Sequence, residues 1–418
     1  MSTAASYNIM SQTMNFNNLT KKHLDLLLKE INSHSYDYIT INSGKLIVHE
    51  VTHFFDHHAT LSGQHLLLKV FNALNEYEHF NKNDECKRKY FPYIMDFLTS
   101  FAKWKQSQHS SVYNTKAYTK HYQDWKFAFE TVHAREVFDH SATEKILIVT
   151  FENLGTAFAK VPFTVESLWE TSAMWSEIEY HYDRVRLLDE EQGIVEISNI
   201  DAHYKAYLYN PDLFVYSIAA HLTSSFCNLG DIFHAFKLSK AISSISLNLP
   251  LKYYKKIKKT KGTLFKGIVN DLLNSNKNLT PTTVFLALLE NLVESNIDIL
   301  KLVDKEILDV NAILTASDLP NRKSIEGEIL KEMNNLSLDI FGSDSYLYKR
   351  LKKQGVNLFK FTGIDGTLKL KSFVLITMAK KLNRCVFQGW DEDALFEEET
   401  LAYARQVYCE KIFDMMIT

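Results

Sequence analysis

Apolar residues recur at the spacing of an α-helix through most of this 418-residue chain. In the first half, this spacing is found in residues 16–33, 45–62, 64–79, 88–106, 112–138 and 165–183. Residues 212–418 continue mainly in the same period, for example in Leu213–Phe226, Thr280–Asp298 and Glu397–Met416. We predict helices for all of these segments, because a stripe of this period lets one helix face be buried. The low counts of 13 Gly and 6 Pro also favour long helices over a turn-rich all-β fold.

A few segments have the composition of β-strands instead. Residues 145–163 contain two extended runs that are separated by the turn-like Asn153-Leu154-Gly155, and the first run is rich in β-branched and aromatic residues. This pattern predicts a β-hairpin. We also predict short extended pieces at Tyr36–Ile41 and Gly193–Ile197. The fold class expected from the pattern is therefore mainly α with a small β component.

The helix predicted over 165–183 has a recognisable start. Pro162 disfavours a helix upstream, and Thr164 can cap the first turn with its hydroxyl group. Glu166 places a negative charge near the positive end of the helix dipole. The hairpin is thus expected to lead directly into this helix.

A division of the chain is expected near Asn210-Pro211-Asp212, because Pro and Asp favour a turn between two helical regions. We predict a catalytic domain over residues 1–210 and a helical domain over residues 211–418 that selects substrate or regulates activity. No repeat with a period of 20–50 residues is found in the sequence.

The chemistry of the first region is indicated by His49-Glu50-Val51-Thr52-His53, an H-E-x-x-H motif in a segment of helical pattern. Two histidines at i and i+4 lie one turn apart on the same helix face and can bind one zinc ion. The glutamate between them can accept a proton from a zinc-bound water. We therefore expect His49 and His53 to be zinc ligands and Glu50 to be the general base.

The residues around the motif fit a helix that exposes this face. Ser43 is a candidate N-cap, and no Pro or Gly interrupts residues 45–62. Asp56 follows His53 on the same face, but three ligands on consecutive turns of one straight helix cannot easily surround one ion. We therefore expect Asp56 to act behind the ligands, accepting an imidazole N–H and fixing the tautomer.

A catalytic zinc site normally has three protein ligands and an open fourth position, so a further ligand is required. The helix predicted downstream contains Glu170-Thr171-Ser172-Ala173-Met174-Trp175-Ser176-Glu177. With the H-E-x-x-H motif, this segment resembles the zincin metallopeptidases of the gluzincin and minigluzincin type, whose second helix often reads E-x-x-A-x-x-x-E. The resemblance implies Glu170 as the third ligand and a small Ala173 where the two helices approach.

Glu177, which the same pattern includes, is expected either behind the ligands or as the reserve third ligand. The resemblance covers two short segments of the chain. Thr171 stands where Gly is frequent in the family, and the separation of His53 from Glu170 is longer than is common in minigluzincins. The metzincins are disfavoured, because Ala59 stands where their third histidine would be.

A peptide hydrolase also needs a donor that stabilises the oxyanion. The candidates by residue type are His181, His203, Tyr204 and Tyr207, and the sequence does not distinguish among them. We assign no role to His57 and His58.

Charge and cysteine content limit the partners. The formal net charge is −3, so no global electrostatic attraction to nucleic acid is expected, although the run Lys252–Lys261 mixes lysines with aromatic residues. The acidic run Glu397-Glu398-Glu399 is explained by the favourable position of negative charges near a helix N-terminus, so it does not indicate a calcium site. The four cysteines are scattered without a C-x-x-C pair, and Met1–Asn15 lacks the pattern of a signal peptide. We expect a cytoplasmic protein without a membrane segment.

The sequence therefore predicts a bacterial zinc metalloendopeptidase whose substrate is an intracellular protein or peptide. The alternative is a non-catalytic helical interaction protein, such as a toxin or a phage-defence component. The two hypotheses differ in whether Glu170 approaches His49 and His53.

Overall fold

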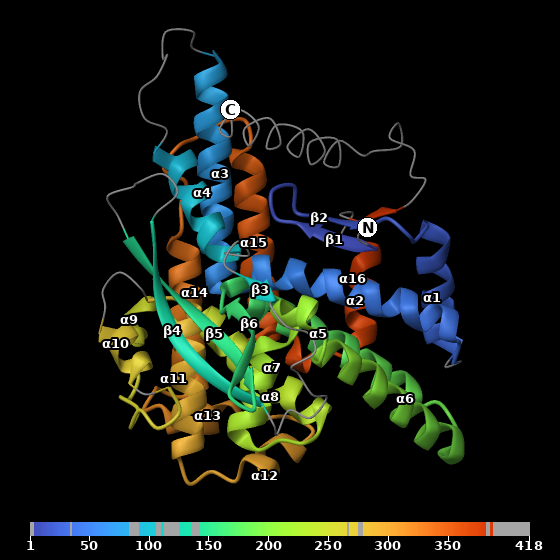
Figure 1. The fold of residues 1–418 in the computed structure, drawn as a ribbon. Helices are drawn as coiled ribbons and strands as arrows, with labels where there is room; N and C mark the ends of the chain where they lie inside the picture. Colours follow the sequence, from blue (N-terminus) through green and yellow to red (C-terminus); the bar gives the residue numbers. More distant parts are fainter. Residues whose placement is uncertain are drawn as a thin grey trace. The chain divides into compact units, whose positions relative to one another are not determined.

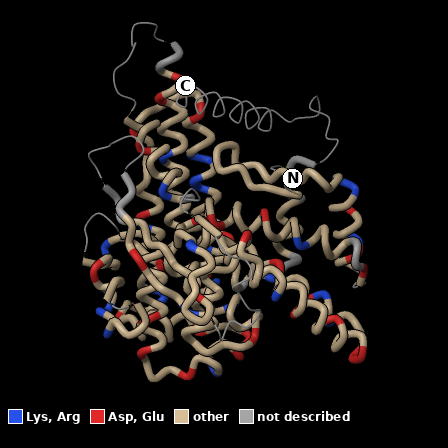
Figure 2. The backbone as a smooth tube through the Cα atoms, in the orientation of Figure 1, with Lys and Arg blue, Asp and Glu red and all other residues tan. Residues whose placement is uncertain are grey.

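The computed structural model describes residues 4–33, 36–82, 92–105, 110–112, 125–135, 143–265, 267–274, 279–381 and 385–387. Of these residues, 67% are helical and a smaller part lies in strands. The prediction of a mainly α protein with a small β component is confirmed. None of the described helices is long and apolar enough to cross a membrane. Figure 2 shows basic and acidic positions interspersed along the described chain.

The described chain divides into two units, each built from several sequence segments. Unit 1 comprises Met1–Phe55, Ala173–Asp201 and Leu370–Thr418, and unit 2 comprises Asp56–Ser172 and Ala202–Lys369. Residues on both sides of position 210 belong to unit 2. The separation into domains at 1–210 and 211–418 stays a prediction.

Unit 1 combines several helices with a small sheet. The helices that lie in it wholly or partly are α1 (Lys21–Ser33), α2 (Tyr38–Ala59), α5 (Val165–Val185), α6 (Glu190–Leu208) and α16 (Ser372–Lys381). A three-stranded sheet completes it, with the order β1 (Ala5–Asn8), β2 (Thr13–Phe16) and β7 (Cys385–Phe387). The strands β1 and β2 are antiparallel, whereas β2 and β7 are parallel, so distant parts of the chain share this sheet (Figure 1).

Unit 2 combines a four-stranded antiparallel sheet with many helices (Figure 1). The sheet order is β3 (Ser111–Val112), β6 (Thr156–Pro162), β5 (Thr143–Asn153) and β4 (Trp125–Arg135). Its helices up to residue 248 include α3 (Leu61–Lys82), α4 (Pro92–Lys105), η3 (Pro211–Leu213), α7 (Phe214–Cys227) and α8 (Ile232–Asn248). The later helices are α9 (Leu251–Tyr254), α10 (Ile268–Asn274), α11 (Pro281–Glu294), α12 (Ile299–Asp304), α13 (Val310–Ala316), α14 (Arg322–Asn335), α15 (Ser345–Thr362) and η4 (Gly366–Lys369).

The hairpin predicted over 145–163 is confirmed as β5 and β6, with a register shift at Phe151/Glu152. The helix predicted over 165–183 is confirmed as α5. Thr164 caps it as expected, because its Oγ1 atom accepts a hydrogen bond from the backbone N–H of Ser167 at 3.3 Å. The start of α5 is therefore set by local chemistry.

The helix predicted over 112–138 is wrong for residues 125–135, which form strand β4, whereas residues 113–124 and 136–138 lie outside the described residues. This strand pairs with β5 along its whole length. Phe127 contacts Phe151 and Phe226, and Phe129 contacts Phe265, so alternate side chains pack on one face of the sheet. Burial of this aromatic face outweighs the weak helical period that the sequence suggests.

Two predicted extended segments are also helical. Residues 38–41 form the start of α2, since the N–H of Ile41 already donates to the carbonyl of Asp37 at 3.1 Å. Ser43 therefore lies inside the helix and is not its N-cap. Residues 193–197 lie in α6, where Asp189 accepts a hydrogen bond from the N–H of Gln192 at 2.8 Å. An acidic cap nucleates a helix there despite its β-branched residues.

The predicted helices Leu213–Phe226 and Thr280–Asp298 correspond to α7 and to α11, which ends at Glu294. The helix predicted over Glu397–Met416 lies outside the described residues, as do Cys86 and Cys409. Cys227 and Cys385 are buried.

Candidate metal centre

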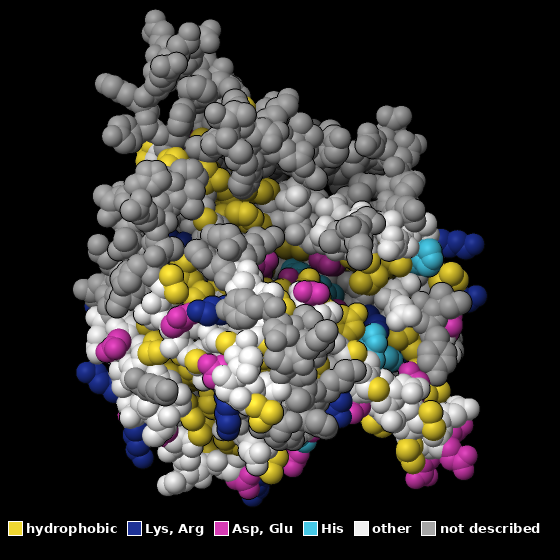
Figure 3. Space-filling model, viewed as in Figure 1, with side chains coloured by type: hydrophobic (Ala, Val, Ile, Leu, Met, Phe, Trp, Pro, Cys, Tyr) yellow, Lys and Arg dark blue, Asp and Glu magenta, His cyan; other side chains and the backbone are white. Residues whose placement is uncertain are grey.

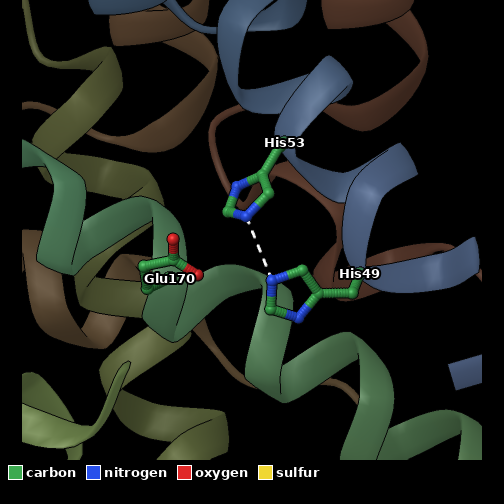
Figure 4. Close-up of side chains that lie close together, drawn as sticks. All are labelled: His49, His53 and Glu170. Atoms are coloured by element: carbon green, nitrogen blue, oxygen red, sulfur yellow. Dashed lines mark hydrogen bonds between the residues drawn. The ribbon is translucent and has the colours of Figure 1, made fainter. Parts of the chain in front are cut away.

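Helix α2 places His49 and His53 one turn apart, and their Nε2 atoms lie 3.1 Å from each other. Two nitrogen ligands bound to zinc at 2.0–2.1 Å in a tetrahedral site would be roughly 3.4 Å apart. Both histidines are buried. The two rings are therefore already oriented so that one ion could bind both nitrogens (Figure 4).

Glu170 on helix α5 supplies a third donor. One ligand atom from each of His49, His53 and Glu170 can be chosen so that all three lie within 4.8 Å of one another. Figure 4 shows the Glu170 carboxylate facing the two imidazoles. Among the described residues, this is the one group of three or more His, Cys, Asp or Glu side chains with such spacing. In the space-filling view, histidine and acidic side chains gather in a hollow over α2 (Figure 3).

Glu177 lies behind His49, because its Oε1 atom is 2.6 Å from Nδ1 of His49. A carboxylate accepts hydrogen bonds, so Nδ1 of His49 carries the proton and donates a hydrogen bond to Glu177. In the neutral imidazole, the lone pair is then on Nε2, the nitrogen that faces His53. Glu177 thus selects the tautomer that a metal ligand requires.

Two further contacts hold α2 against α5 beside these residues. The hydroxyl groups of Thr52 and Ser176 are hydrogen-bonded at 2.8 Å. The Tyr180 side chain lies against Gly44, where a Cβ atom would be 2.3 Å from the phenol oxygen. Ala173 is fully buried on α5, as its place in the family-like pattern implies. Small side chains at these positions allow the close packing that keeps the donors in position.

Glu50 lies between the two histidines in sequence and is buried, with 5% of its surface exposed. On α2 it follows His49 by one residue and precedes His53 by three. A carboxylate in this environment can receive a proton from a water held beside the two imidazoles.

Tyr7 in strand β1 is part of the same surroundings, although its position in the sequence gave no reason to select it. Its ring stacks on His53, with ring centroids 6.5 Å apart and planes at 28°. It also meets Phe54 edge-on at 6.5 Å. The strand β1 thus covers one side of the histidine pair.

Charged side chains extend from Glu177 along unit 1. Burial lowers the pKa of Lys45, one turn before His49, while the negative charges of Glu177 and Glu196 act in the opposite direction. His181 lies 3.4 Å from Glu196, and both side chains are buried. Among the oxyanion candidates, the structure therefore places His181 in this ion-pair network.

The other oxyanion candidates lie together on α6. The rings of His203 and Tyr204 are 5.0 Å apart, and those of His203 and Tyr207 are 5.1 Å apart. Tyr204 is buried, whereas Tyr207 is 37% exposed. His203, Tyr204 and Tyr207 thus form one cluster of rings on α6.

Asp56 forms an ion pair with a lysine. Its Oδ1 atom lies 3.6 Å from Nζ of Lys240, and both side chains are almost completely buried. Next to it, His57 packs against Trp169 with ring centroids 5.7 Å apart, and burial holds the pKa of His57 well below its usual value. We expected Asp56 to accept a hydrogen bond from an imidazole N–H, and at His49 the acceptor is Glu177.

The lysine-rich run lies partly in α9, and its two tyrosines are buried. Lys252 forms an ion pair with Glu328 at 2.5 Å. The aromatic rings are therefore covered by protein, and they are not arranged to stack on bases.

No protein family model, no curated protein and no solved structure matches this chain.

The structure brings together His49, His53 and Glu170, with Glu177 directly behind His49. The neighbouring Tyr7 and Lys45 were missed by sequence reasoning. The signal for Lys45 was its spacing of four residues before His49, which places it on the same side of α2. No local pattern indicated Tyr7, because its contact with His53 depends on tertiary packing.

Proposed function

We propose that this protein is a cytoplasmic zinc metalloendopeptidase that hydrolyses peptide bonds of an intracellular protein. The observation that carries the proposal is the convergence of two facing imidazole nitrogens and one carboxylate from a second helix. Two nitrogens and one oxygen form the donor set of a well-known type of catalytic zinc site, in which the fourth position is open. The buried Glu50, which follows His49 on α2, supports hydrolysis over a purely structural site.

His49, His53 and Glu170 would hold the ion. Zinc supplies, when bound, a Lewis acid that polarises the scissile carbonyl and makes a water molecule more acidic. Glu50 accepts the proton of the attacking water and then donates it to the leaving amine. Glu177 keeps the proton of His49 on Nδ1 through both steps, so the orientation of the ring does not change.

The first test is the metal content of the purified full-length protein. We expect about one zinc per chain by elemental analysis after zinc supplementation, and less than a tenth of this in His49→Ala and His53→Ala. His234→Ala is the matched control, because its ring pairs with Asp304 at 3.2 Å and is not part of the donor set. Absence of zinc from the folded wild-type protein would contradict the proposal and favour a non-catalytic interaction protein.

The second test separates binding from catalysis. Glu50→Gln should keep the zinc and lose cleavage of fluorogenic casein, of a peptide library and of the protein itself, because the amide cannot accept the proton. Any of these substrates that the wild-type protein cleaves can serve as the readout. A zinc-loaded Glu50→Gln protein with wild-type activity would remove Glu50 from this role. A wild-type protein that binds zinc but cleaves none of them would limit the proposal to a metal-binding protein.

A further inference from the structure

Unit 2 contains a cavity of about 470 Å³. Helices α3 and α4 line one side, β5 and the start of α5 line another, and residues of α8 to α11 and of α14 complete it. The volume is within the range of protein pockets that hold small molecules. All lining residues belong to unit 2, and none of them is a residue that we assign to the metal centre. The cavity therefore has no part in the proposed hydrolysis.

The interior of the cavity is apolar. Its walls include Ile146, Phe163, Trp169, Leu247 and Leu249, each of which is more than nine-tenths buried. A surface of this kind favours an apolar occupant, because burial of apolar area removes it from water at about 25 cal/mol per Å². The interior therefore selects a ligand that is mainly apolar.

The charged side chains of the lining already interact with other protein groups. His65 pairs with Glu332 at 3.2 Å, and Lys69 pairs with Asp96 at 2.9 Å. Lys103 also interacts with other groups of the protein. A ligand charge placed in the apolar interior would thus be separated from water without gaining an unpaired counter-charge, which is costly. The lining therefore favours an uncharged ligand.

Tyr254 adds a hydrogen-bond donor to the lining. Its side chain is buried, and within the described part of the chain its hydroxyl group makes no hydrogen bond. Burial raises the pKa of this phenol, and the negative charge of Glu332 acts in the same direction, so the hydroxyl group stays protonated. Because Glu332 itself lines the cavity, the hydroxyl group lies on the cavity side of the ring. An oxygen atom of a ligand would supply the acceptor that this donor lacks.

We propose that this cavity binds an uncharged, mainly apolar molecule that carries a carbonyl oxygen. The apolar part lies against the buried side chains of the interior, and the carbonyl oxygen accepts a hydrogen bond from the hydroxyl group of Tyr254. A carbonyl group fits this position because it accepts a hydrogen bond without bringing a charge into the cavity. The proposal does not depend on the proposed peptidase activity, so the two stand or fail separately.

The test compares benzophenone with diphenylmethane, which has a methylene group in place of the carbonyl group. We expect saturable binding of both to the full-length protein by calorimetry. Benzophenone should bind roughly two- to tenfold more tightly, the effect of one hydrogen bond between neutral groups. Absence of saturable benzophenone binding, or equal binding of the two probes, would overturn the proposal.

Two charged analogues test whether the ligand has to be neutral. Diphenylacetate is the anionic analogue and diphenylmethylammonium is the cationic one. Each should bind at least about tenfold more weakly than diphenylmethane, because its charge would be buried without a partner. Tighter binding of either ion than of benzophenone would contradict the proposed ligand class.

A matched pair of tyrosine variants tests the hydrogen bond. Tyr254→Phe removes the hydroxyl group and keeps the ring, so it should lower the affinity for benzophenone to that for diphenylmethane and leave the latter unchanged. Tyr253→Phe should keep the wild-type preference, because Tyr253 is also buried but is not part of the lining. Thermal melting checks folding. A wild-type preference for benzophenone in a folded Tyr254→Phe protein would show that Tyr254 is not the donor.

Photolabelling locates the site independently of Tyr254. Under ultraviolet light, benzophenone inserts into nearby C–H bonds, and mass spectrometry should find the label on residues that line the cavity. Leu279→Trp narrows the cavity from a half-buried position and should reduce this labelling by about tenfold or more. Leu300→Trp, at an exposed position outside the lining, should not. Label found only outside the lining, or unchanged labelling in a folded Leu279→Trp protein, would contradict this location.

Discussion

The Nδ1–H group of His49 donates a hydrogen bond to Oε1 of Glu177 at 2.6 Å, and this bond links the H-E-x-x-H helix to the second helix of the site. The bond acts through His49, because it holds the ring and leaves Nε2 toward His53. Glu177 is therefore a positioning residue. Glu170, seven residues earlier on α5, is the residue whose carboxylate joins the two imidazoles.

This arrangement predicts different losses of zinc affinity for two glutamates on one helix. Glu177→Gln should lower zinc affinity by roughly 10–100-fold, the range typical of groups that orient a metal ligand. Glu170→Ala should lower it further, because a two-histidine site remains. Competitive titration with a chelator measures both. Equal and small losses would show that Glu170 is not a ligand, and a larger loss for Glu177→Gln would make Glu177 the ligand.

The buried pair of Asp56 and Lys240 predicts a change in stability. Asp56→Asn leaves the lysine ammonium buried beside a neutral amide, and we expect a loss of roughly 3–5 kcal/mol in the free energy of unfolding. Urea denaturation measures it. Asp304→Asn, at a pair whose carboxylate is 65% exposed, should change stability by less than about 1 kcal/mol.

The double variant Asp56→Asn/Lys240→Met removes both charges. It should be more stable than Asp56→Asn alone, because the uncompensated ammonium is gone. If Asp56→Asn keeps wild-type stability but loses zinc, Asp56 acts on the metal centre as the sequence first suggested, and the ion pair has no large effect.

Gly44 predicts an exception to the usual effect of alanine in helices. Gly to Ala inside a helix normally stabilises by about 1 kcal/mol. At Gly44 the new Cβ atom would lie 2.3 Å from the Tyr180 phenol oxygen, so the buried Tyr180 ring must shift, and we expect a loss of roughly 1–3 kcal/mol. Gly327→Ala in α14 has open space around the new atom and should be stabilising. Thermal melting of the two variants should show shifts of opposite sign.

His221 predicts a pH dependence of stability in unit 2. Its Nε2 atom donates to the carbonyl of Leu208 at 2.6 Å, and burial lowers its pKa from 6.5 to about 4. The folded protein therefore keeps this ring neutral where the unfolded chain would bind a proton. Its contribution is complete above pH 6.5 and is lost as the pH falls toward 4, by about 3 kcal/mol in total.

The measurement is the free energy of unfolding between pH 7 and pH 4. His221→Asn should reduce the slope in this range by up to about 1.4 kcal/mol per pH unit, whatever its effect at pH 7. His65→Asn, whose side chain is 45% exposed, should keep the wild-type slope. An unchanged slope in His221→Asn would show that His221 is not the group responsible.

Local sequence chemistry determined several elements of this protein correctly. Hydrophobic period and low Gly and Pro content predicted a mainly α fold, which is confirmed. The turn at Asn153-Leu154-Gly155 and the cap at Thr164 depend on neighbouring residues, so the hairpin and the start of α5 could be predicted. The spacing of His49 and His53 likewise follows from the helix repeat.

Tertiary structure decided the remainder, because the deciding contacts join residues that are distant in sequence. Strand β4 exists through its pairing with β5 and through packing of Phe129 on Phe265. The approach of Glu170 to the imidazoles depends on how α5 packs against α2. Lys240 at Asp56 and Tyr7 at His53 come from chain segments with no recognisable motif. A spacing rule reaches only one or two turns of one helix, whereas packing complementarity between elements determines which side chains meet.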